Sequence, residues 1–201
     1  MGEQYFEKRP ASAHRPREIR FAIRGHAFTF RTDAGVFSRG KLDRGTELLL
    51  EAIAIRPRQR VLDLGCGYGA IGIVAARLSG IGPVVLTDVN ERAVALARTN
   101  LVVNGIRNGE VRLGPLYEPV GGMAFDHIVS NPPIRAGRGI VDRIVADAPA
   151  HLVDGGSLWL VARTRQGADA LRSRMAMAFG SAEIVERGSG FKVLRSTRPE
   201  A

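Results

Sequence analysis

The sequence lacks three features that would each point to a different class of protein. Cys66 is its single cysteine, which excludes an internal disulfide and fits a reducing cytoplasm. No apolar run approaches the ~20 residues of a membrane span, and the charged N-terminal stretch lacks the apolar core of a signal peptide. The four histidines, His14, His26, His127 and His151, show no metal-ligand spacing. We therefore expect a cytoplasmic protein with no membrane segment and no metal site.

Lysine is scarce too, although the chain is basic, with 29 basic residues, 20 acidic ones and a formal net charge of +9. Lys8, Lys41 and Lys192 are the only lysines, so nearly all of the positive charge is arginine. Arginine clamps phosphate with two hydrogen bonds and stacks on bases, which favours nucleic acid as a partner. Ordinary solubility and an arginine-rich composition caused by GC-rich coding stay open as alternatives.

The length of 201 residues and a hydrophobic fraction of 45% predict one domain with a full core. Residues 1–45 differ from the rest because they mix aromatics with arginines. Within them, 19–24 and 27–31 alternate apolar and polar side chains, which predicts two short strands joined at Gly25 and His26. We expect residues 1–45 to form an N-terminal cap hairpin and a cofactor-pocket segment, and 46–201 to form the main domain.

From Thr46 onward the pattern predicts a short helix that ends before Pro57, followed by alternating strands and helices. Such alternation is typical of a parallel sheet with helices on both faces. The tail, 182–186 and 191–196, predicts a hairpin at the edge of that sheet. The expected strands are 60–64, 83–88, 110–113, 125–130 and 156–162, and the expected helices lie near 69–79, 91–103, 138–150 and 165–178.

The stretch 61–70 reads Asp-x-Gly-x-Gly-x-Gly after an apolar run, the layout of a strand, a tight loop and a helix start at a nucleotide site. Asp63 argues against a dinucleotide, because its carboxylate lies near the place of a pyrophosphate. S-adenosylmethionine (SAM) instead carries a sulfonium and an ammonium group. At ~4 Å and an effective dielectric of ~20 their attraction to a carboxylate is about 4 kcal/mol before desolvation. The alternative is that Asp63 caps a helix or stabilises the loop.

Asp88 ends the next expected strand, where an acidic side chain can accept both ribose hydroxyls of an adenosine ligand. An acidic residue at this position is compatible with SAM and with NAD alike. The alternative is that Asp88 is a solvated residue at the end of a strand, with no role in binding. Cys66 lies in the cofactor loop, whereas carbon-5 pyrimidine methyltransferases carry their nucleophilic cysteine in the substrate motif. We therefore expect Cys66 to be a structural thiol.

Asn131, Pro132, Pro133 and Ile134 follow the expected strand 125–130 and form the second motif. The prolines fix φ and remove two N–H donors, which leaves the Asn131 side-chain oxygen and the Pro132 carbonyl as acceptors. Two acceptors that hold the hydrogens of an amine or carboxamide can direct its lone pair at a methyl group, and geometry supplies most of the rate of such a transfer. The motif thus predicts an N-methyltransferase, with a rigid turn as the alternative.

Together with Gly35-Val36-Phe37-Ser38 and Leu42-Asp43-x-Gly45-Thr46, these motifs closely resemble the small stand-alone relatives of the RsmC/RlmG ribosomal RNA guanine-N2 methyltransferases (the MTS domain), class I SAM-dependent enzymes. The resemblance runs from Tyr5 to about Ser196. It implies a Rossmann-like, mostly parallel seven-stranded sheet with a reversed last strand, and it adds Phe37, Ser38, Asp43 and Thr46 to the cofactor pocket. The expected cofactor-binding set is Phe37, Ser38, Asp43, Thr46, Asp63, Gly65, Cys66, Gly67, Gly69, Asp88, Val89 and Asn131.

Two positions depart from the pattern of the family. Ile134 stands where many N-methyltransferases carry an aromatic that stacks on the target, and Pro115 stands where relatives carry Asp or Asn to meet the adenine amine. The expected catalytic set is Asn131, Pro132, Pro133 and Ile134.

The expected substrate is the exocyclic N2 of a guanine in small-subunit ribosomal RNA, in free RNA or a ribosomal subunit. Two alternatives stay open. One is methylation of another planar nitrogen, in a protein glutamine or a DNA adenine, and the other is a non-catalytic module that binds SAM or RNA. A basic rim is expected to bind the RNA, made of Arg15, Arg17, Arg20, Arg24, Arg135, Arg138 and Arg143.

Overall fold

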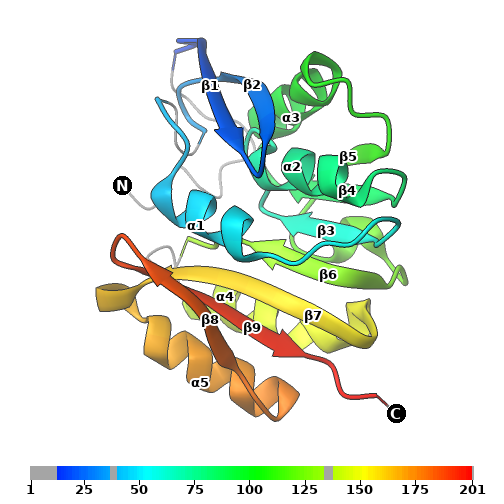
Figure 1. Cartoon of the computed structure of the whole chain (residues 1–201), viewed down its shortest axis with the longest axis vertical. Helices are drawn as coiled ribbons and strands as arrows, with labels where there is room; N and C mark the ends of the chain where they lie inside the picture. Colours follow the sequence, from blue (N-terminus) through cyan, green and yellow to red (C-terminus); the bar gives the residue numbers. More distant parts are fainter. Residues whose placement is uncertain (1–12, 37–39, 134–137, 201) are drawn as a thin grey trace.

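The computed structural model describes residues 13–36, 40–133 and 138–200. Seven strands form one sheet in the order β5-β4-β3-β6-β7-β9-β8, as Figure 1 shows. Neighbours from β5 to β7 pair in parallel, and β9 runs antiparallel to both β7 and β8. The predicted mostly parallel sheet with one reversed strand is confirmed. The strands are β3 (Val61–Leu64), β4 (Val84–Asp88), β5 (Gly109–Leu113), β6 (Phe125–Ser130), β7 (Leu152–Arg163), β8 (Glu183–Gly188) and β9 (Phe191–Thr197).

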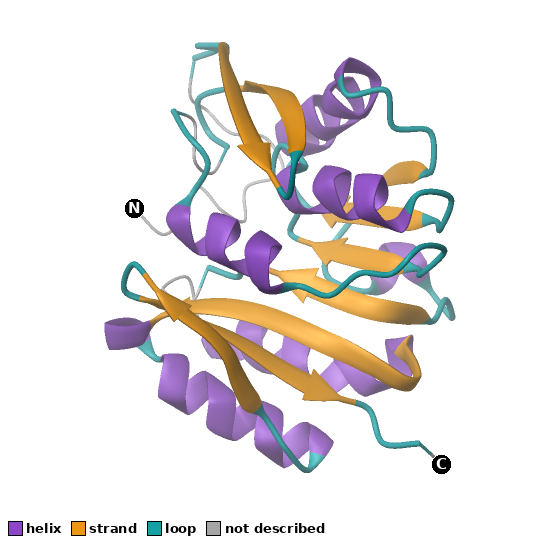
Figure 2. Ribbon diagram, viewed as in Figure 1, coloured by secondary structure: helices purple, strands orange, loops and turns teal. Residues whose placement is uncertain are grey.

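Helices cover both faces of the sheet (Figure 2), because successive strand side chains point to opposite sides. In β3, Val61 packs into the core under α1, α2 and α3, whereas Leu62 and Leu64 pack into the core under α4 and α5. The α-helices are α1 (Arg44–Ala52), α2 (Ala70–Ser79), α3 (Glu91–Val103), α4 (Arg138–Asp147) and α5 (Ala168–Phe179), with 3₁₀ turns at η2 (Glu118–Val120), η4 (Ala148–His151) and η5 (Thr164–Gln166).

The predicted elements differ from the observed ones mainly at their ends. The helix expected near 138–150 leaves α geometry after Asp147, and a 3₁₀ turn that contains Pro149 continues it. The helix expected near 165–178 starts later, because Gly167 adopts a left-handed φ of 101° between η5 and α5. The strand expected at 156–162 extends back to Leu152, which pairs with Phe125 across a register shift.

A two-stranded hairpin, β1 (Arg17–Ile23) and β2 (His26–Thr32), packs against α3, and the predicted N-terminal hairpin is thereby confirmed. Its turn lies one residue earlier than expected, at Arg24 and Gly25, whose φ values of 49° and 79° suit a tight hairpin turn. Its buried residues, Ile19, Ile23, Phe28 and Phe30, belong to the same core cluster as α1, α2 and α3. The predicted division at residue 45 stays a prediction.

Two asparagines four residues apart, Asn100 in α3 and Asn104 at its C-cap, bind β2 as a neighbouring strand would. Asn100 accepts the Arg31 N–H (2.7 Å) and donates to the Arg31 carbonyl (2.9 Å). Asn104 does the same for Thr29, at 3.0 and 2.8 Å. Because each amide offers one acceptor and two donors, it satisfies both backbone groups of one residue. The pair fastens the hairpin to the main domain.

Candidate cofactor and active site

The glycine loop between β3 and α2 lies at the carboxyl end of the sheet, where ligands bind in open α/β folds. Gly65, Gly67 and Gly69 have φ values of 71°, 57° and 93°, which glycine adopts most readily. The Gly67 N–H donates to the Asp88 carboxylate at 2.8 Å, so the loop is tied to the end of β4. The expected loop glycines thus lie together beside Asp88.

Asp63 is completely buried below this loop, with one of its oxygens unsatisfied. Its Oδ2 accepts the Gly72 N–H of α2 at 2.7 Å, while Oδ1 has no hydrogen-bond partner in the part of the chain that the structure describes. Burial raises the pKa of Asp63 to about 7. The contact to Gly72 favours the helix-capping alternative. The unsatisfied oxygen suits the ammonium group of SAM, and a role in cofactor binding stays a prediction.

Gly72 itself was not singled out from the sequence. A Cβ at this position would lie 2.4 Å from Leu86 Cγ, so α2 lies directly on β4 at this point. The same close approach brings the Gly72 N–H to Asp63. In the sequence Gly72 is one more glycine of a glycine-rich stretch, and its contact to Leu86 becomes visible only in the folded chain.

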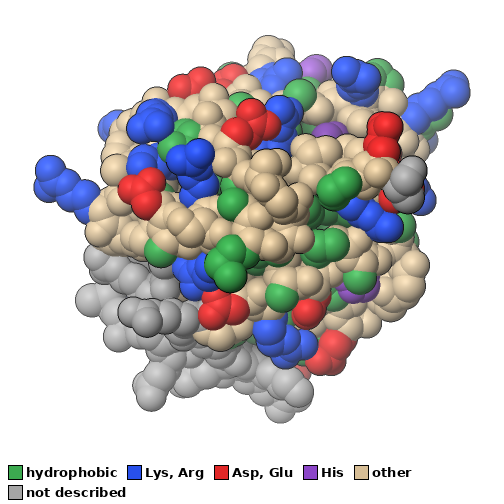
Figure 3. Space-filling view, turned by 90° about the horizontal axis from the view of Figure 1, so that it is seen from below, with side chains coloured by type: hydrophobic (Ala, Val, Ile, Leu, Met, Phe, Trp, Pro, Cys, Tyr) green, Lys and Arg blue, Asp and Glu red, His purple; other side chains and the backbone are tan. Residues whose placement is uncertain are grey.

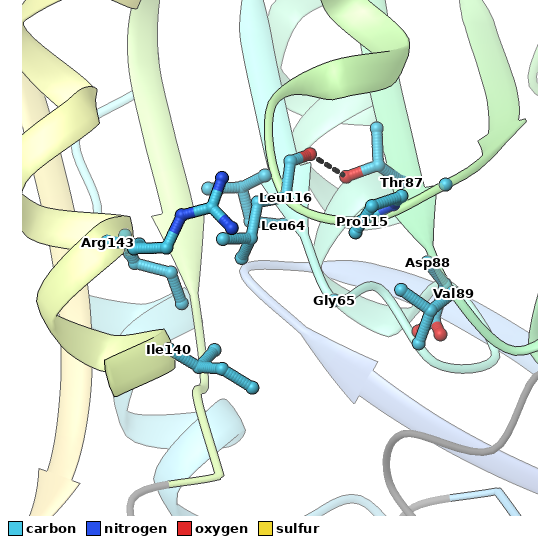
Figure 4. Close-up of a pocket in the computed structure, with 11 residues that line it drawn as sticks. Leu64, Gly65, Thr87, Asp88, Val89, Pro115, Leu116, Ile140 and Arg143 are labelled. Carbon is cyan, nitrogen blue, oxygen red and sulfur yellow. Dashed lines mark hydrogen bonds between the residues drawn. The ribbon is translucent and has the colours of Figure 1, made fainter. Parts of the chain in front are cut away.

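A cavity of about 180 Å³ opens at this edge between the strand ends and α4 (Figure 4). Pockets for drug-sized ligands occupy ~300–1,000 Å³, so this cavity has room for part of a nucleoside cofactor. Ile140 and Arg143 of α4 face Val89, Pro115 and Leu116 across it. Its lining consists of Leu64, Gly65, Thr87, Asp88, Val89, Gly114, Pro115, Leu116, Ile140, Arg143 and Ile144.

Asp88 is the acidic group of this cavity and is 8% exposed. Besides the Gly67 N–H, it accepts the Asn90 N–H at 2.9 Å, and burial raises its pKa above the usual range. Two backbone donors fix the orientation of its carboxylate, and each carboxylate oxygen can accept a further hydrogen bond. The geometry therefore suits a contact with ribose hydroxyls.

Four apolar members of the lining, Leu64, Leu116, Ile140 and Ile144, were not predicted. Spacing could have indicated the last two, since Ile140, Arg143 and Ile144 lie on one helical face at i, i+3 and i+4. Pro115 does line the cavity, where it supplies no side-chain acceptor, and Arg143 lies in the cavity wall although it was expected in the RNA-binding rim.

Asn131 lies at the end of β6, beside the cavity residue Leu64. The preceding Ser130 hydroxyl donates to the Leu64 carbonyl at 2.7 Å, which holds the two strand ends together. The Asn131 amide nitrogen donates to Asp43 Oδ2 (3.1 Å) and to Thr46 Oγ1 (2.9 Å). Asp43 and Thr46, expected at the cofactor pocket, thus contact Asn131. Of the other expected site residues, Phe37, Ser38 and Ile134 lie outside the described residues.

Cys66 is buried, and its thiol contacts the neighbouring Gly67 carbonyl at 3.6 Å. Burial raises the pKa of the thiol well above its usual value. Since the thiolate is the nucleophilic form, such a cysteine is unreactive. This agrees with a structural thiol. Within the described ranges, no group of three His, Cys, Asp or Glu residues is arranged to hold a metal ion.

The structure does not bring all expected RNA-binding arginines together. Arg24 donates to the Ile53 carbonyl at the carboxyl end of α1, whereas Asp43 and Asn131 lie at the other end of that helix. Arg17 lies at the open end of the hairpin, and Arg20 is ion-paired with Glu18. Arg135 and the side chain of Arg138 lie outside the described residues.

The residues of this edge fit SAM, with an unsatisfied buried carboxylate oxygen, a glycine loop and an acidic group that lines a cavity with room for part of the cofactor. Fold and site together define a Rossmann-like SAM-dependent methyltransferase. Residues 27–195 match the family model described as "Methyltransferase small domain". The chain belongs to this family.

Several known proteins are similar to this chain, in sequence or in structure, over most of its length. A protein of Bacillus subtilis named "Uncharacterized protein YbxB" is 33% identical over 98% of this chain and 100% of its own length. Ribosomal RNA small subunit methyltransferase C of Serratia proteamaculans is 35% identical over 86% of this chain and 49% of that protein. The structure of T. thermophilus 16S rRNA N2 G1207 methyltransferase (RsmC) in complex with AdoMet and guanosine has a TM-score of 0.83 and 28% identity, covering 94% of this chain and 52% of that one. The chain spans about half the length of these RNA methyltransferases.

Searched over the described residues, the structure has no helix that is long and apolar enough to cross a membrane.

Proposed function

We propose that this protein transfers the methyl group of SAM to the exocyclic N2 of a guanine in small-subunit ribosomal RNA. The observation that carries the proposal is the placement of Asn131 and Pro132 at the end of β6, next to the strand that leads into the cofactor loop. The similarity to RsmC proteins supports the choice of guanine and ribosomal RNA.

The role that we propose for each group follows from its chemistry. SAM, when bound, would supply a methyl group activated by its positively charged sulfur. The target nitrogen would form the new bond to the methyl carbon as the carbon–sulfur bond breaks to leave a neutral thioether, and the methylated nitrogen would then release one proton to solvent. The Asn131 side-chain oxygen and the Pro132 carbonyl accept the two hydrogens of the guanine amine and so aim its lone pair. The Asp88 carboxylate accepts the ribose hydroxyls. Positioning of this kind supplies most of the rate of such a transfer.

The RNA would approach the edge that carries the cavity. Arg17 pairs with Thr32 at the open end of the hairpin, and the chain just beyond, at Ala34 and Gly35, is bound by Arg92 and Asn90 beside the cofactor loop. A base held in a helix cannot reach a pocket at this edge, so loops or open strands are the favoured targets. The face in Figure 3 mixes basic and acidic side chains.

The experiment is methyl transfer from labelled SAM to RNA from a strain that lacks the gene, offered both as free 16S RNA and as the small subunit. RNA from the parent strain, whose target is already methylated, is the matched control. We expect label in N2-methylguanosine from the deletion strain alone. Label found only in protein or in another nucleoside would contradict the proposal, and either result would identify the alternative substrate.

A further inference from the structure

The side chain of Asn131 is held by two residues of the α1 start, Asp43 and Thr46. Its Nδ2 lies 3.1 Å from Asp43 Oδ2 and 2.9 Å from Thr46 Oγ1. A carboxylate accepts hydrogen bonds and donates none, so the Asn131 atom that faces Asp43 must be the nitrogen. The reverse orientation would place two oxygens 3.1 Å apart, without a hydrogen between them.

Asp43 is itself held rigidly. It is the N-cap of α1, and Oδ2 accepts the N–H groups of Gly45 (2.9 Å) and Thr46 (3.1 Å) in addition to Asn131. The first turn of α1 lies close against β9, since a Cβ on Gly45 would lie 2.7 Å from the Phe191 ring. Thr46 is 5% exposed. The carboxylate and hydroxyl that meet Asn131 are therefore fixed by the packing of a whole helix.

We propose that Asp43 and Thr46 are positioning residues of the methyl transfer, which keep the Asn131 oxygen turned toward the target nitrogen. This inference rests on the proposed function and adds two residues to it. With its nitrogen fully engaged, Asn131 presents only an acceptor. Hydrogen bonding to a carboxylate also polarises the amide and strengthens that acceptor. A target nitrogen gains positive charge as it is methylated, and the nearby negative charge of Asp43 favours that change.

This fixed orientation of the Asn131 amide excludes one class of target. A group that must receive a hydrogen bond, such as a carbonyl or an unprotonated ring nitrogen, meets an oxygen at Asn131 and is repelled. A group that carries N–H, such as an exocyclic amine, meets the acceptor it needs. Asp43 and Thr46 thereby contribute to the choice of the nitrogen that is methylated.

The first test removes the acceptor at position 43. Asp43→Gly leaves α1 with an acceptable N-cap but takes away the oxygen that faces Asn131. Asp43→Asn is a weaker change, because the Gly45 and Thr46 N–H groups still need an acceptor at the same atom, so an oxygen stays there and only the charge is lost. Asn131→Asp places two carboxylates next to each other, and the double variant of Asp43→Gly and Asn131→Asp removes that conflict. Glu47→Gln, a charge removal at an exposed position in the same helical turn, is the matched control.

We expect Asp43→Gly to lower kcat about tenfold or more with KM changed by less than about threefold, Asp43→Asn to lower kcat less, and Asn131→Asp to lower it further than either. The double variant of Asp43→Gly and Asn131→Asp should be no slower than Asn131→Asp alone, a sign of direct coupling. Thr46→Val should lose several-fold, and Thr46→Ser, which keeps the hydroxyl, should lose less. Equal rates for Asp43→Gly and Glu47→Gln, or a double variant slower than both single ones, would overturn the inference.

A second readout needs no substrate. The side-chain amide hydrogens of Asn131, assigned in a ¹⁵N-labelled sample by their loss in Asn131→Asp, should exchange slowly with water and should become fast in Asp43→Gly but not in Glu47→Gln. Exchange at the rate of a free amide in the wild type overturns the fixed orientation, whatever the RNA assay gives. Absence of RNA methylation by the wild type, with slow exchange retained, rejects the proposed substrate and leaves the fixed orientation in place.

Discussion

His127 on β6 lies between two polar partners in the interior of the sheet. The Trp159 indole N–H donates to His127 Nδ1 at 3.2 Å, so the ring hydrogen lies on Nε2, which donates to Gln59 Oε1 at 2.9 Å. A protonated ring would carry hydrogens on both nitrogens and lose the bond from Trp159. Burial lowers the pKa of His127 below 6.5. The hydrogen bond from Trp159 therefore requires neutral His127, so protonation of His127 destabilises the folded state.

We expect the free energy of unfolding to fall on acidification through this residue. The unfolded chain takes up a proton near pH 6.5 and the folded chain only at lower pH, so the contribution is complete above about pH 6.5 and is lost as the pH falls below it. Urea unfolding of wild type and His127→Gln between pH 8 and 5 measures the difference, with a slope of at most about 1.4 kcal/mol per pH unit. Parallel curves for the two proteins would show that His127 does not cause the effect.

Asp88 is the residue whose loss should most affect the cofactor. Asp88→Ala removes the acceptor expected for the ribose and leaves the Gly67 N–H of the glycine loop without its partner at the end of β4. We expect SAM affinity to fall about tenfold or more, roughly 1.4 kcal/mol, in calorimetry. Asp154→Asn, at an exposed ion pair with Arg198, is the control and should bind SAM normally. Unaltered binding by Asp88→Ala would place the ribose elsewhere.

At the scale of elements, the attachment of the hairpin to α3 is the feature with the clearest test. Asn100 is completely buried, and besides its two bonds to Arg31 it donates to the Tyr68 carbonyl at 2.8 Å. Asn100→Ala leaves three backbone groups without this partner, of which the Tyr68 carbonyl is buried and the two Arg31 groups are part-buried. Since an unpaired buried group costs ~1–3 kcal/mol and a part-buried one less, we expect a loss of about 3 kcal/mol in the free energy of unfolding. Val102→Ala, at an 81% exposed position of the same helix, should change it little.

Hydrogen exchange locates this effect. In Asn100→Ala the Arg31 and Thr29 amides should exchange faster, while those of β3 remain protected against all but global unfolding. Equal acceleration over the whole sheet would mean that the hairpin and the main domain open as one unit.

The elements were predictable from the sequence to different degrees. Alternation of strand and helix patterns predicted the strands β3, β4, β5 and β6. Of these, β3, β4 and β6 are buried almost throughout and read as short apolar runs, whereas β5 lies at the edge of the sheet with Val111 as its one buried residue. The ends of helices and strands were predicted less well where a single residue determines them. Gly167, for example, determines where α5 begins. Asn100 and Asn104 were not predicted, because an asparagine on a helix has the same appearance whether it faces water or a strand some 70 residues away in sequence.

At the scale of the molecule, the motifs predicted which residues meet at the carboxyl edge better than they predicted what each one does. Asp63 and Asp88 lie beside the glycine loop as expected. Asp43 and Thr46 contact Asn131, a partnership that requires the packing of α1 and that no local pattern reveals. Arg24 was placed in the basic rim on charge alone, whereas its position at the hairpin turn directs it to the end of α1.

The net charge of +9 leads to a prediction of how the affinity for RNA depends on salt concentration. If the RNA binds across the cavity edge, its affinity should fall steeply with salt, and Arg17→Ala should reduce the log–log slope by about 1 for each phosphate that the variant no longer binds. Arg187→Ala, exposed on the edge strand β8, is the matched control. Fluorescence anisotropy between about 50 and 200 mM salt measures both. A flat response in every variant would remove RNA from the account.

The central claim is that Asn131, although expected also among the cofactor-binding residues, contributes more to orienting an amine for methylation than to binding SAM. The most direct measurement is the single-turnover rate of Asn131→Ala on the methyl-accepting RNA, with SAM affinity measured on the same sample. The account predicts a rate lower by about a hundredfold or more, roughly 2.7 kcal/mol, with SAM affinity changed less than about threefold. A rate equal to that of the wild type, or a loss explained entirely by weaker SAM binding, would contradict it.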